Sequence, residues 1–308
     1  MAVIINGRDL TVEEVIRVCR GYEKVEIAPE AKEAVIKARN YIEKKLEEGA
    51  VIYGLTTGFG KFANVVISRE EAEQLQKNLI ISHTCAMGEP YETKYVRAAM
   101  LLRCNALSRG NSGIRLETIQ TMIDMLNAGI HPVIPEKGSL GASGDLAPLS
   151  HIALALIGLG EVEYKGQIVP AAEAMAKEGI IPVVLAAKEG LALNNGTQMM
   201  TAVGVNVLWD AMHLMKTADI ATAMTAEALH GITKAYDHKV HDLRGHQGQK
   251  DAAENLRTLL AGSKNAFEVQ PSKVQDPYSL RCIPQIHGAS RDAIQYVYEA
   301  VSRELNAV

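Results

Sequence analysis

The segment that decides the fold is TQMMTAVGVNVLWDAMHLMKTADIATAMTAEALH, residues 197–230. It contains no proline and one glycine, Gly204, and apolar residues occupy nearly every side of the helix that it would form. A helix that is apolar all round is typically buried, and this one would be about 50 Å long at about 1.5 Å per residue. The segment therefore predicts the long central helix of a bundle, which several subunits could share.

Helical patterns also dominate on both sides of this segment. Thr11 and Glu14 form a capping-box pattern ahead of an apolar stripe, and Gly129 is a typical helix stop. Further helices are predicted over 29–48, 69–83, 91–108, 116–127, 146–159 and 290–308, the last without a stop signal. The clearest strand pattern is a hairpin at 162–169. The protein is thus predicted to be mainly α, with irregular segments at 53–63, 131–147, 190–196 and 262–288, where we expect the chemistry.

Length and composition exclude several classes of protein. The 308 residues are 47% hydrophobic, which gives a sizeable core and excludes a disordered chain. The four cysteines are far apart in the sequence, which excludes a disulfide-stapled secreted module and favours reduced thiols in the cytoplasm. A net charge of −4 without a basic block argues against nucleic acid as a partner. The most apolar stretch, 146–160, is shorter than the roughly 20 residues that a membrane helix needs, and the N-terminus has no signal-peptide pattern.

Residues 138–151, GSLGASGDLAPLSH, allow three interpretations. One is an ordinary turn with Asp145 as the N-cap of the next helix, and another is a phosphate-binding turn, although neither the Walker nor the GxGxxG pattern is present. The third treats Ala142, Ser143 and Gly144 as a unit. Because glycine has no Cβ, the nitrogen of Gly144 can approach the carbonyl carbon of Ala142 and close a five-membered ring. Loss of one water from ring closure and one from Ser143 leaves an exocyclic methylene, an electrophile that ordinary side chains do not provide.

Six motifs, taken in order along nearly the whole chain, resemble the aromatic amino acid ammonia-lyases and in particular their histidine-acting members. They are YGLTTGFGKF at 53–62, SH at 82–83, RGNSGIR at 109–115, the segment 138–151, LALNNGTQ at 191–198 and QDPYSLRCIPQ at 275–285. The resemblance implies that Ala142, Ser143 and Gly144 cyclise without help to a 4-methylidene-imidazol-5-one (MIO) prosthetic group, with no external cofactor. It also implies a long-helix bundle of the ammonia-lyase type, similar to fumarase and aspartase.

The resemblance implies a role for each matched residue of the N-terminal part. Tyr53 corresponds to the catalytic base that removes the β-proton of the substrate, and Asp145 to the residue that assists ring formation. Asn195 corresponds to a catalytic asparagine, whereas Asn194 is expected to be structural. His83 corresponds to the residue that binds the substrate side chain. The Ser-His pair that ends at His83 is typical of members that act on histidine, since one imidazole can hydrogen-bond another.

The last matched segment corresponds to one that reaches the active site of a neighbouring subunit. Gln275 and Arg281 are implied in substrate binding and Tyr278 in catalysis. The planar fork of Arg281 can hold both oxygens of a substrate carboxylate, although without the match a surface ion pair would be the ordinary interpretation. No metal site is predicted, because the histidine pair at 238 and 241 lacks a cysteine or a clear third carboxylate ligand.

The reaction implied by the resemblance is the non-oxidative deamination of L-histidine to urocanate and ammonia. The alternatives are a tyrosine or phenylalanine ammonia-lyase or an aminomutase. We expect an active-site region at 1–196 and the start of a central helical bundle at 197–308. Family members continue with further helices, so the chain is expected to be a fragment, half of a split enzyme with a separate C-terminal chain, or a non-catalytic relative with a structural or interaction role. The family also implies a homotetramer.

Overall fold

The structure is a computed structural model that describes residues 2–52, 54–58, 67, 69–140 and 144–308. The chain divides into two compact units. Unit 1 comprises residues 1–206 and 302–308, and unit 2 comprises residues 207–301. The functional division predicted after residue 196 stays a prediction, because these units are defined only by contacts within the chain.

Unit 1 is built around helix α4 (Thr93–Ser108). Every residue from 96 to 108 is buried, including the charged Arg97 and Arg103, and α4 packs against α1, α2 and α5. The helices of unit 1 are α1 (Val12–Cys19), α2 (Pro29–Glu47), α3 (Arg69–His83), α4, α5 (Leu116–Ala128), α6 (Leu146–Leu156), α7 (Ala171–Lys177), α8 (Glu189–Asn194) and the first turns of α9 (Gln198–Ala228). The chain is therefore mainly helical, as predicted.

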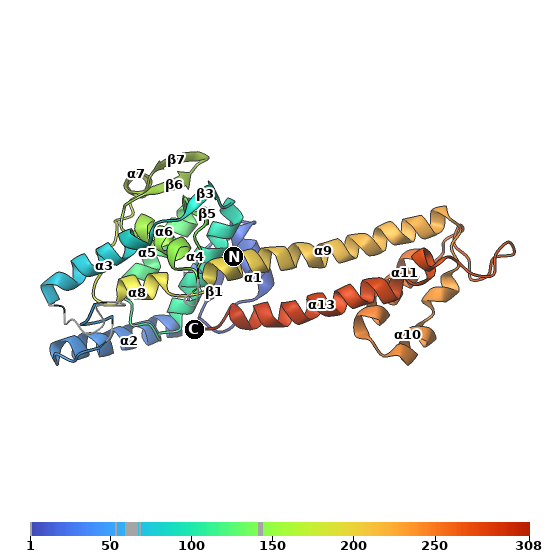
Figure 1. Cartoon of the computed structure of the whole chain (residues 1–308), viewed down its shortest axis with the longest axis horizontal. Helices are drawn as coiled ribbons and strands as arrows, with labels where there is room; N and C mark the ends of the chain where they lie inside the picture. The colour runs from blue at the N-terminus through green and yellow to red at the C-terminus, as the bar shows by residue number, and fades with distance from the viewer. Residues whose placement is uncertain (1, 53, 59–66, 68, 141–143) are drawn as a thin grey trace. The chain divides into compact units, whose positions relative to one another are not determined.

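Local signals explain where several of these helices begin and end. The predicted capping box is confirmed, since the side chain of Thr11 accepts the N–H of Glu14 and the side chain of Glu14 accepts the N–H of Thr11. Helix α5 ends at Ala128 and is capped by Gly129, whose φ of 73° is the left-handed conformation that glycine adopts without strain. Irregular structure was predicted over 190–196, but the short helix α8 occupies most of that segment, and α8 packs against α3 and α6 (Figure 1).

In the described part of unit 1 the strands are short and lie in three small sheets. Strand β1 (Val3–Ile5) pairs in parallel with β2 (Val25–Ile27), and β3 (Met87–Pro90) pairs with β5 (Pro135–Lys137). Strand β4 (Ile130–Pro132) pairs with β6 (Glu161–Tyr164), which forms the predicted hairpin with β7 (Gln167–Pro170). The hairpin turn has positive φ at both Lys165 and Gly166, the conformation that matches the twist of the two strands.

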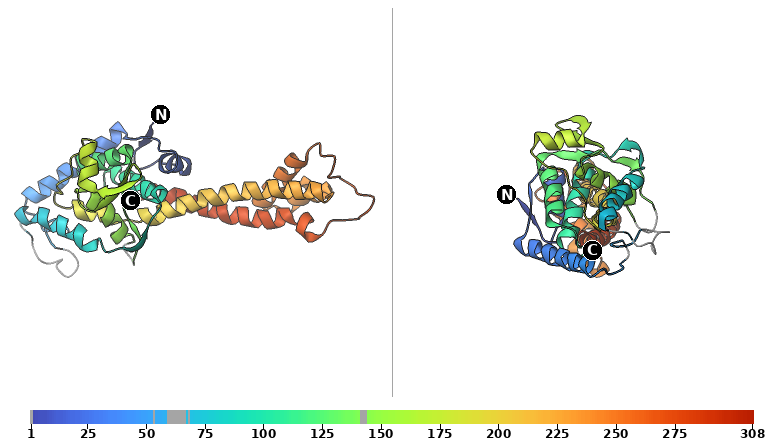
Figure 2. Two further views of the ribbon diagram at one scale, coloured as in Figure 1. Left: turned by 90° about the horizontal axis from the view of Figure 1, so that it is seen from above. Right: turned by 90° about the vertical axis from the view of Figure 1, so that its left-hand side faces the viewer.

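Unit 2 consists of the rest of α9 and of the elements that follow it. These are the 3-10 helix η2 (Thr233–Tyr236), α10 (His238–Arg244), α11 (Gln247–Leu260), α12 (Tyr278–Arg281) and most of α13 (Ile283–Glu304). Figure 2 shows α9 and α13 running side by side in this unit. A buried carboxylate joins them, since Asp219 of α9 accepts hydrogen bonds from His287 (2.7 Å) and Arg291 of α13. Tyr236 and Leu256 belong to an apolar core cluster of unit 2.

Helix α9 was expected to be buried in a bundle that several subunits could share. Within the single chain Leu214 and Met224 are each 66% exposed, so the burial of these side chains between subunits stays a prediction. The predicted bounds of the last helix are wrong. The last helix was expected to run from 290 to 308, but it begins at Ile283 and ends at Glu304. The next residues return to unit 1, where the side chain of Asn306 accepts the N–H of Leu10 at 2.9 Å. In the described part of the chain, no helix is both long enough and apolar enough to cross a membrane.

Candidate active site

Of the segment with the predicted electrophile, the structure describes residues 138–140 and 144–151. Its predicted precursors Ala142 and Ser143 lie outside the described residues, as does Tyr53. Gly144 has a φ of +74° and pairs with Gly196 in a short parallel bridge. A Cβ at Gly144 would lie 2.7 Å from the carbonyl oxygen of Gly196, so no larger residue fits. The glycine required for ring closure therefore stands where both the backbone conformation and the available space require glycine.

Asp145 fastens this segment to the start of α9. It is 1% exposed, its N–H donates to the carbonyl of Gly196 at 3.0 Å, and its carboxylate accepts the N–H of Met200 at 2.7 Å. The hydroxyl of Ser139 donates to the other carboxylate oxygen at 2.8 Å. Asp145 is the N-cap residue of α6, as predicted, but its side chain makes no cap hydrogen bond to α6 and instead caps the first turn of α9. A carboxylate at this place also interacts favourably with the helix dipole of α9.

The two asparagines between α8 and α9 have different surroundings. Asn194 is fully buried, and its amide reaches the hydroxyl of Ser150 at 3.4 Å, which supports the structural role predicted for it. Asn195 is exposed at the C-terminal end of α8, one residue before the glycine that pairs with Gly144. The structure thus brings three predicted site residues, Gly144, Asp145 and Asn195, to one place in unit 1.

His83 lies at the last position of α3 and is half-buried. Its Nδ1 lies 2.9 Å from the carbonyl oxygen of Leu79, and the hydroxyl of Ser82 donates to the same oxygen at 2.9 Å. The hydroxyl of Ser82 also lies 3.0 Å from Nδ1, so Ser82 and Leu79 both contact this edge of the ring. An imidazole with its proton on Nδ1 accepts a hydrogen bond at Nε2, and one with its proton on Nε2 donates there.

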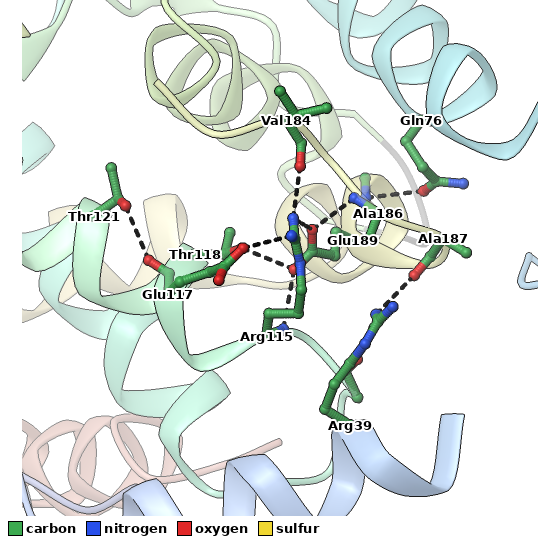
Figure 3. A network of polar contacts seen from close by, with 12 residues as sticks. Arg39, Gln76, Arg115, Glu117, Thr118, Thr121, Val184, Ala186, Ala187 and Glu189 are labelled. Carbon is green, nitrogen blue, oxygen red and sulfur yellow. Dashed lines mark hydrogen bonds and ion pairs between the residues drawn. The ribbon is translucent and has the colours of Figure 1, made fainter. Parts of the chain in front are cut away.

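A buried polar network holds the start of α8 (Figure 3). The carboxylate of Glu189 is inaccessible and accepts four hydrogen bonds, which come from the backbone N–H groups of Arg115 and Ala186, the guanidinium of Arg115 and the hydroxyl of Thr118, at 2.6–3.0 Å. Beside it, the side chain of Gln76 accepts the N–H of Gly190 at 2.9 Å. Sequence reasoning missed Glu189, although Arg115 belongs to the RGNSGIR motif and Glu189 lies two residues before LALNNGTQ begins.

Arg103 holds the other end of α8. Its guanidinium donates to the carbonyl of Ala192 and, at 2.7 Å, to the side-chain oxygen of Gln198. Burial lowers the pKa of Arg103 to about 10, and the described part of the chain gives it no carboxylate partner. Sequence reasoning missed this residue too, because an arginine within an apolar helix has no local motif.

The remaining predicted residues belong to unit 2. Gln275 is exposed, Tyr278 is 70% exposed, and the guanidinium carbon of Arg281 lies 4.3 Å from the centre of the Tyr278 ring. The neighbouring Asp276 is buried and anchors this segment, since it accepts the N–H of Ile232 at 2.5 Å and pairs with Lys273 at 2.6 Å. Asp276 thus fixes the backbone between Gln275 and Tyr278, which leaves both of those side chains accessible.

Comparisons with known proteins agree on the family of this fold. The family model described as aromatic amino acid lyase matches residues 10–308. Curated relatives include histidine ammonia-lyases from Alkaliphilus metalliredigens, 56% identical over 99% of this chain and 60% of the relative, and from Clostridium tetani, 54% identical with the same coverage.

Solved structures give the same result. Histidine ammonia-lyase from Trypanosoma cruzi is 38% identical with a TM-score of 0.90, over all of this chain and 57% of that one. Phenylalanine aminomutase from Pantoea agglomerans is 35% identical with a TM-score of 0.93, over 99% of this chain and 63% of that one. These matches confirm the predicted mainly α bundle of the ammonia-lyase type. They also confirm MIO as the prosthetic group of the family. The chain spans about 60% of the length of its curated relatives. The chain belongs to the aromatic amino acid lyase family.

Proposed function

We propose that the chain carries the N-terminal part of the active site of an enzyme that converts L-histidine to urocanate and ammonia. The observation that supports this most directly is its identity of 50–56% with several proteins named histidine ammonia-lyase, over almost its entire length. The paired glycines at 144 and 196 add a structural reason, since they provide the backbone that ring closure at the triplet needs.

The residues around the triplet fit the MIO group. Gly144 adopts a positive φ in a place without room for a Cβ, and Asp145 ties the segment to the first turn of α9. Ala142, Ser143 and Gly144 would supply the atoms of the ring. An electrophile of this kind withdraws electrons from the bound amino acid, which makes its β-proton more acidic and ammonia a better leaving group.

We assign to His83 the binding of the substrate side chain. We assign the ring proton to Nδ1, which lies 2.9 Å from the carbonyl oxygen of Leu79, so that Nε2 accepts the N–H of a substrate imidazole. Phenylalanine has no such donor, and its ring would leave the lone pair of His83 unpaired. This geometry favours histidine over the aromatic amino acids of the alternative functions.

The other matched residues take their proposed roles from the resemblance to the family. Tyr53 removes the β-proton, and the exposed amide of Asn195 lines the site. Arg281 binds the substrate carboxylate in the site of a second copy, where Gln275 and Tyr278 accompany it. The ring of Tyr278 lies 4.3 Å from the guanidinium carbon of Arg281 and orients this group for the carboxylate.

We also propose a cytoplasmic homotetramer. The exposed apolar side chains on α9, such as Val207 and Leu214, suit an interface between copies, and the four cysteines are all unpaired. The relatives contain a further part beyond the matched region, which a separate C-terminal half chain could supply. A tyrosine or phenylalanine lyase or an aminomutase remains the second candidate, favoured by the structural likeness to phenylalanine and tyrosine aminomutases at 35–37% identity.

The test measures urocanate absorbance after L-histidine is added to the purified chain, both alone and with a second chain that supplies the rest of the relatives' length. We expect urocanate in at least one of these conditions, with no turnover of tyrosine or phenylalanine. The matched control is Ser143→Ala, which has no hydroxyl to lose and should be inactive. Absence of urocanate in both conditions, or equal turnover of phenylalanine, would contradict the proposal.

A further inference from the structure

Arg103 is a buried cation whose only described acceptors are uncharged. Its side chain is 6% exposed, and it donates to the Ala192 carbonyl and to the side-chain oxygen of Gln198, while its Nε has no partner among the described residues. Burying a charge is costly, and uncharged acceptors offset this cost less well than a carboxylate does. We therefore interpret this buried charge as one that fixes the position of the segments to which it donates hydrogen bonds.

The two acceptors of Arg103 lie on either side of the turn 195–197. Ala192 contributes one of the last carbonyls of α8, an end of a helix that a cation stabilises, and Gln198 is the first residue of α9. The guanidinium therefore bridges the end of one helix and the start of the next. Gly196, inside the turn, lies directly against it, since a Cβ there would come within 3.0 Å of both Arg103 and Gln198.

The opposite side of the same turn carries the electrophile segment. The carbonyl of Gly196 accepts the N–H of Asp145 at 3.0 Å, and Gly196 pairs with Gly144. The carboxylate of Asp145 then returns to the first turn of α9 at Met200. The turn is thus held between Arg103 on one side and the residues that follow the triplet on the other.

We propose that Arg103 is a positioning residue for the electrophile. Its guanidinium fixes the turn 195–197 so that Gly196 can pair with Gly144 and Asp145, which sets the geometry for ring closure at Ala142. The second half of this proposal rests on the proposed function, whereas the first half concerns only the backbone pairing.

The experiment compares the full chain with Arg103→Met and with a matched control, Arg97→Met. Arg97 is also buried in α4 and also donates to backbone carbonyls, at Val18 (2.8 Å) and Leu126 (3.1 Å), away from the turn. Amide hydrogen exchange is measured by mass spectrometry over residues 144–149 and 196–203. We expect Arg103→Met to speed exchange there by about tenfold or more, since each lost bond to a charged donor is worth at least that factor.

The control variant should leave those segments protected and should speed exchange near residues 18 and 126 instead. Arg103→Lys keeps the charge but lacks the fork that reaches two acceptors, so it should restore part of the protection. Removing the acceptor with Gln198→Leu should act in the same direction as Arg103→Met, and the double variant should be little worse than Arg103→Met, which already loses both bonds.

The intact mass is the second readout. We expect the wild-type chain to weigh less than its sequence by two waters, about 36 Da, and Arg103→Met to retain most of that mass while Arg97→Met does not. Unchanged exchange in Arg103→Met, or equal opening of 144–149 and 196–203 by both variants, would overturn the positioning role. If the wild-type chain loses no water, it is ring formation, and with it the proposed function, that fails, while the exchange comparison still decides the role of Arg103.

Discussion

Replacing Gly144 by alanine measures how much the tight contact between Gly144 and the carbonyl oxygen of Gly196 limits the free energy of unfolding. The new Cβ meets two costs, because alanine at a φ of +74° is strained by about 1–2 kcal/mol and the methyl group would lie 2.7 Å from the Gly196 carbonyl. A backbone oxygen cannot swing aside as a flexible side chain can, so the crowding should add about 1–3 kcal/mol. We expect Gly144→Ala to lower the free energy of unfolding of unit 1 by about 2–5 kcal/mol.

Gly129→Ala is the matched control for this change. Gly129 has nearly the same φ, +73°, and an added Cβ would meet nothing within 4 Å, so only the strain of about 1–2 kcal/mol applies. Thermal unfolding followed by circular dichroism should separate the variants by roughly 2–12 °C, given about 2–4 °C per kcal/mol for a unit of this size. Equal melting temperatures for the two variants would refute the reasoning that the pairing of Gly144 with Gly196 is tight.

Three further changes probe other parts of unit 1. His131 donates to Glu163, and burial lowers the pKa of His131. The unfolded chain therefore takes up the proton first, and the free energy of unfolding should fall as the pH drops below about 6.5. His131→Gln should flatten the dependence of the melting temperature on pH between about 5.5 and 7.5, and an unflattened profile would contradict this. In a urea titration, Glu189→Gln should lower the free energy of unfolding by about 3–5 kcal/mol because its donors lose a buried carboxylate. The control Glu117→Gln, at an exposed residue, should change it by less than about 0.5 kcal/mol. Asp145→Ala should cost about 0.5–2 kcal/mol as the loss of a helix cap and should speed amide exchange at residues 199–201; slow exchange there would show that the cap does not hold α9.

Sequence patterns predicted those features that depend on neighbours along the chain. The capping box at Thr11, the stop at Gly129 and the hairpin around Lys165 all follow from backbone preferences within a few residues, and the structure confirms each of them. The parallel pair of β1 and β2 was missed because each strand is only three residues long. Segments this short carry too little periodicity to be recognised.

The site was predicted only where a motif names its residues. Gly144, Asp145 and Asn195 were found by motif and lie together, yet the partner of Asp145 is on another helix, and no local pattern could assign it. Arg103 and Glu189 were missed for the same physical reason, since their partners come from distant segments such as 192–198 and 115–118. Long-range polar contacts of this kind depend on packing, which a single sequence does not specify.

The bond between Asp145 and Met200 also determines when, during synthesis of the chain, the electrophile segment can adopt its final geometry. Its two ends are 55 residues apart, so Asp145 can bind Ser139 but not α9 until α9 begins to leave the ribosome. At about 5–20 residues per second, that delay amounts to roughly 3–11 s. A nascent chain that stalls within this interval would therefore carry Ala142, Ser143 and Gly144 without the bond from Asp145 to α9, so their covalent maturation in this geometry can only follow synthesis of the first turn of α9.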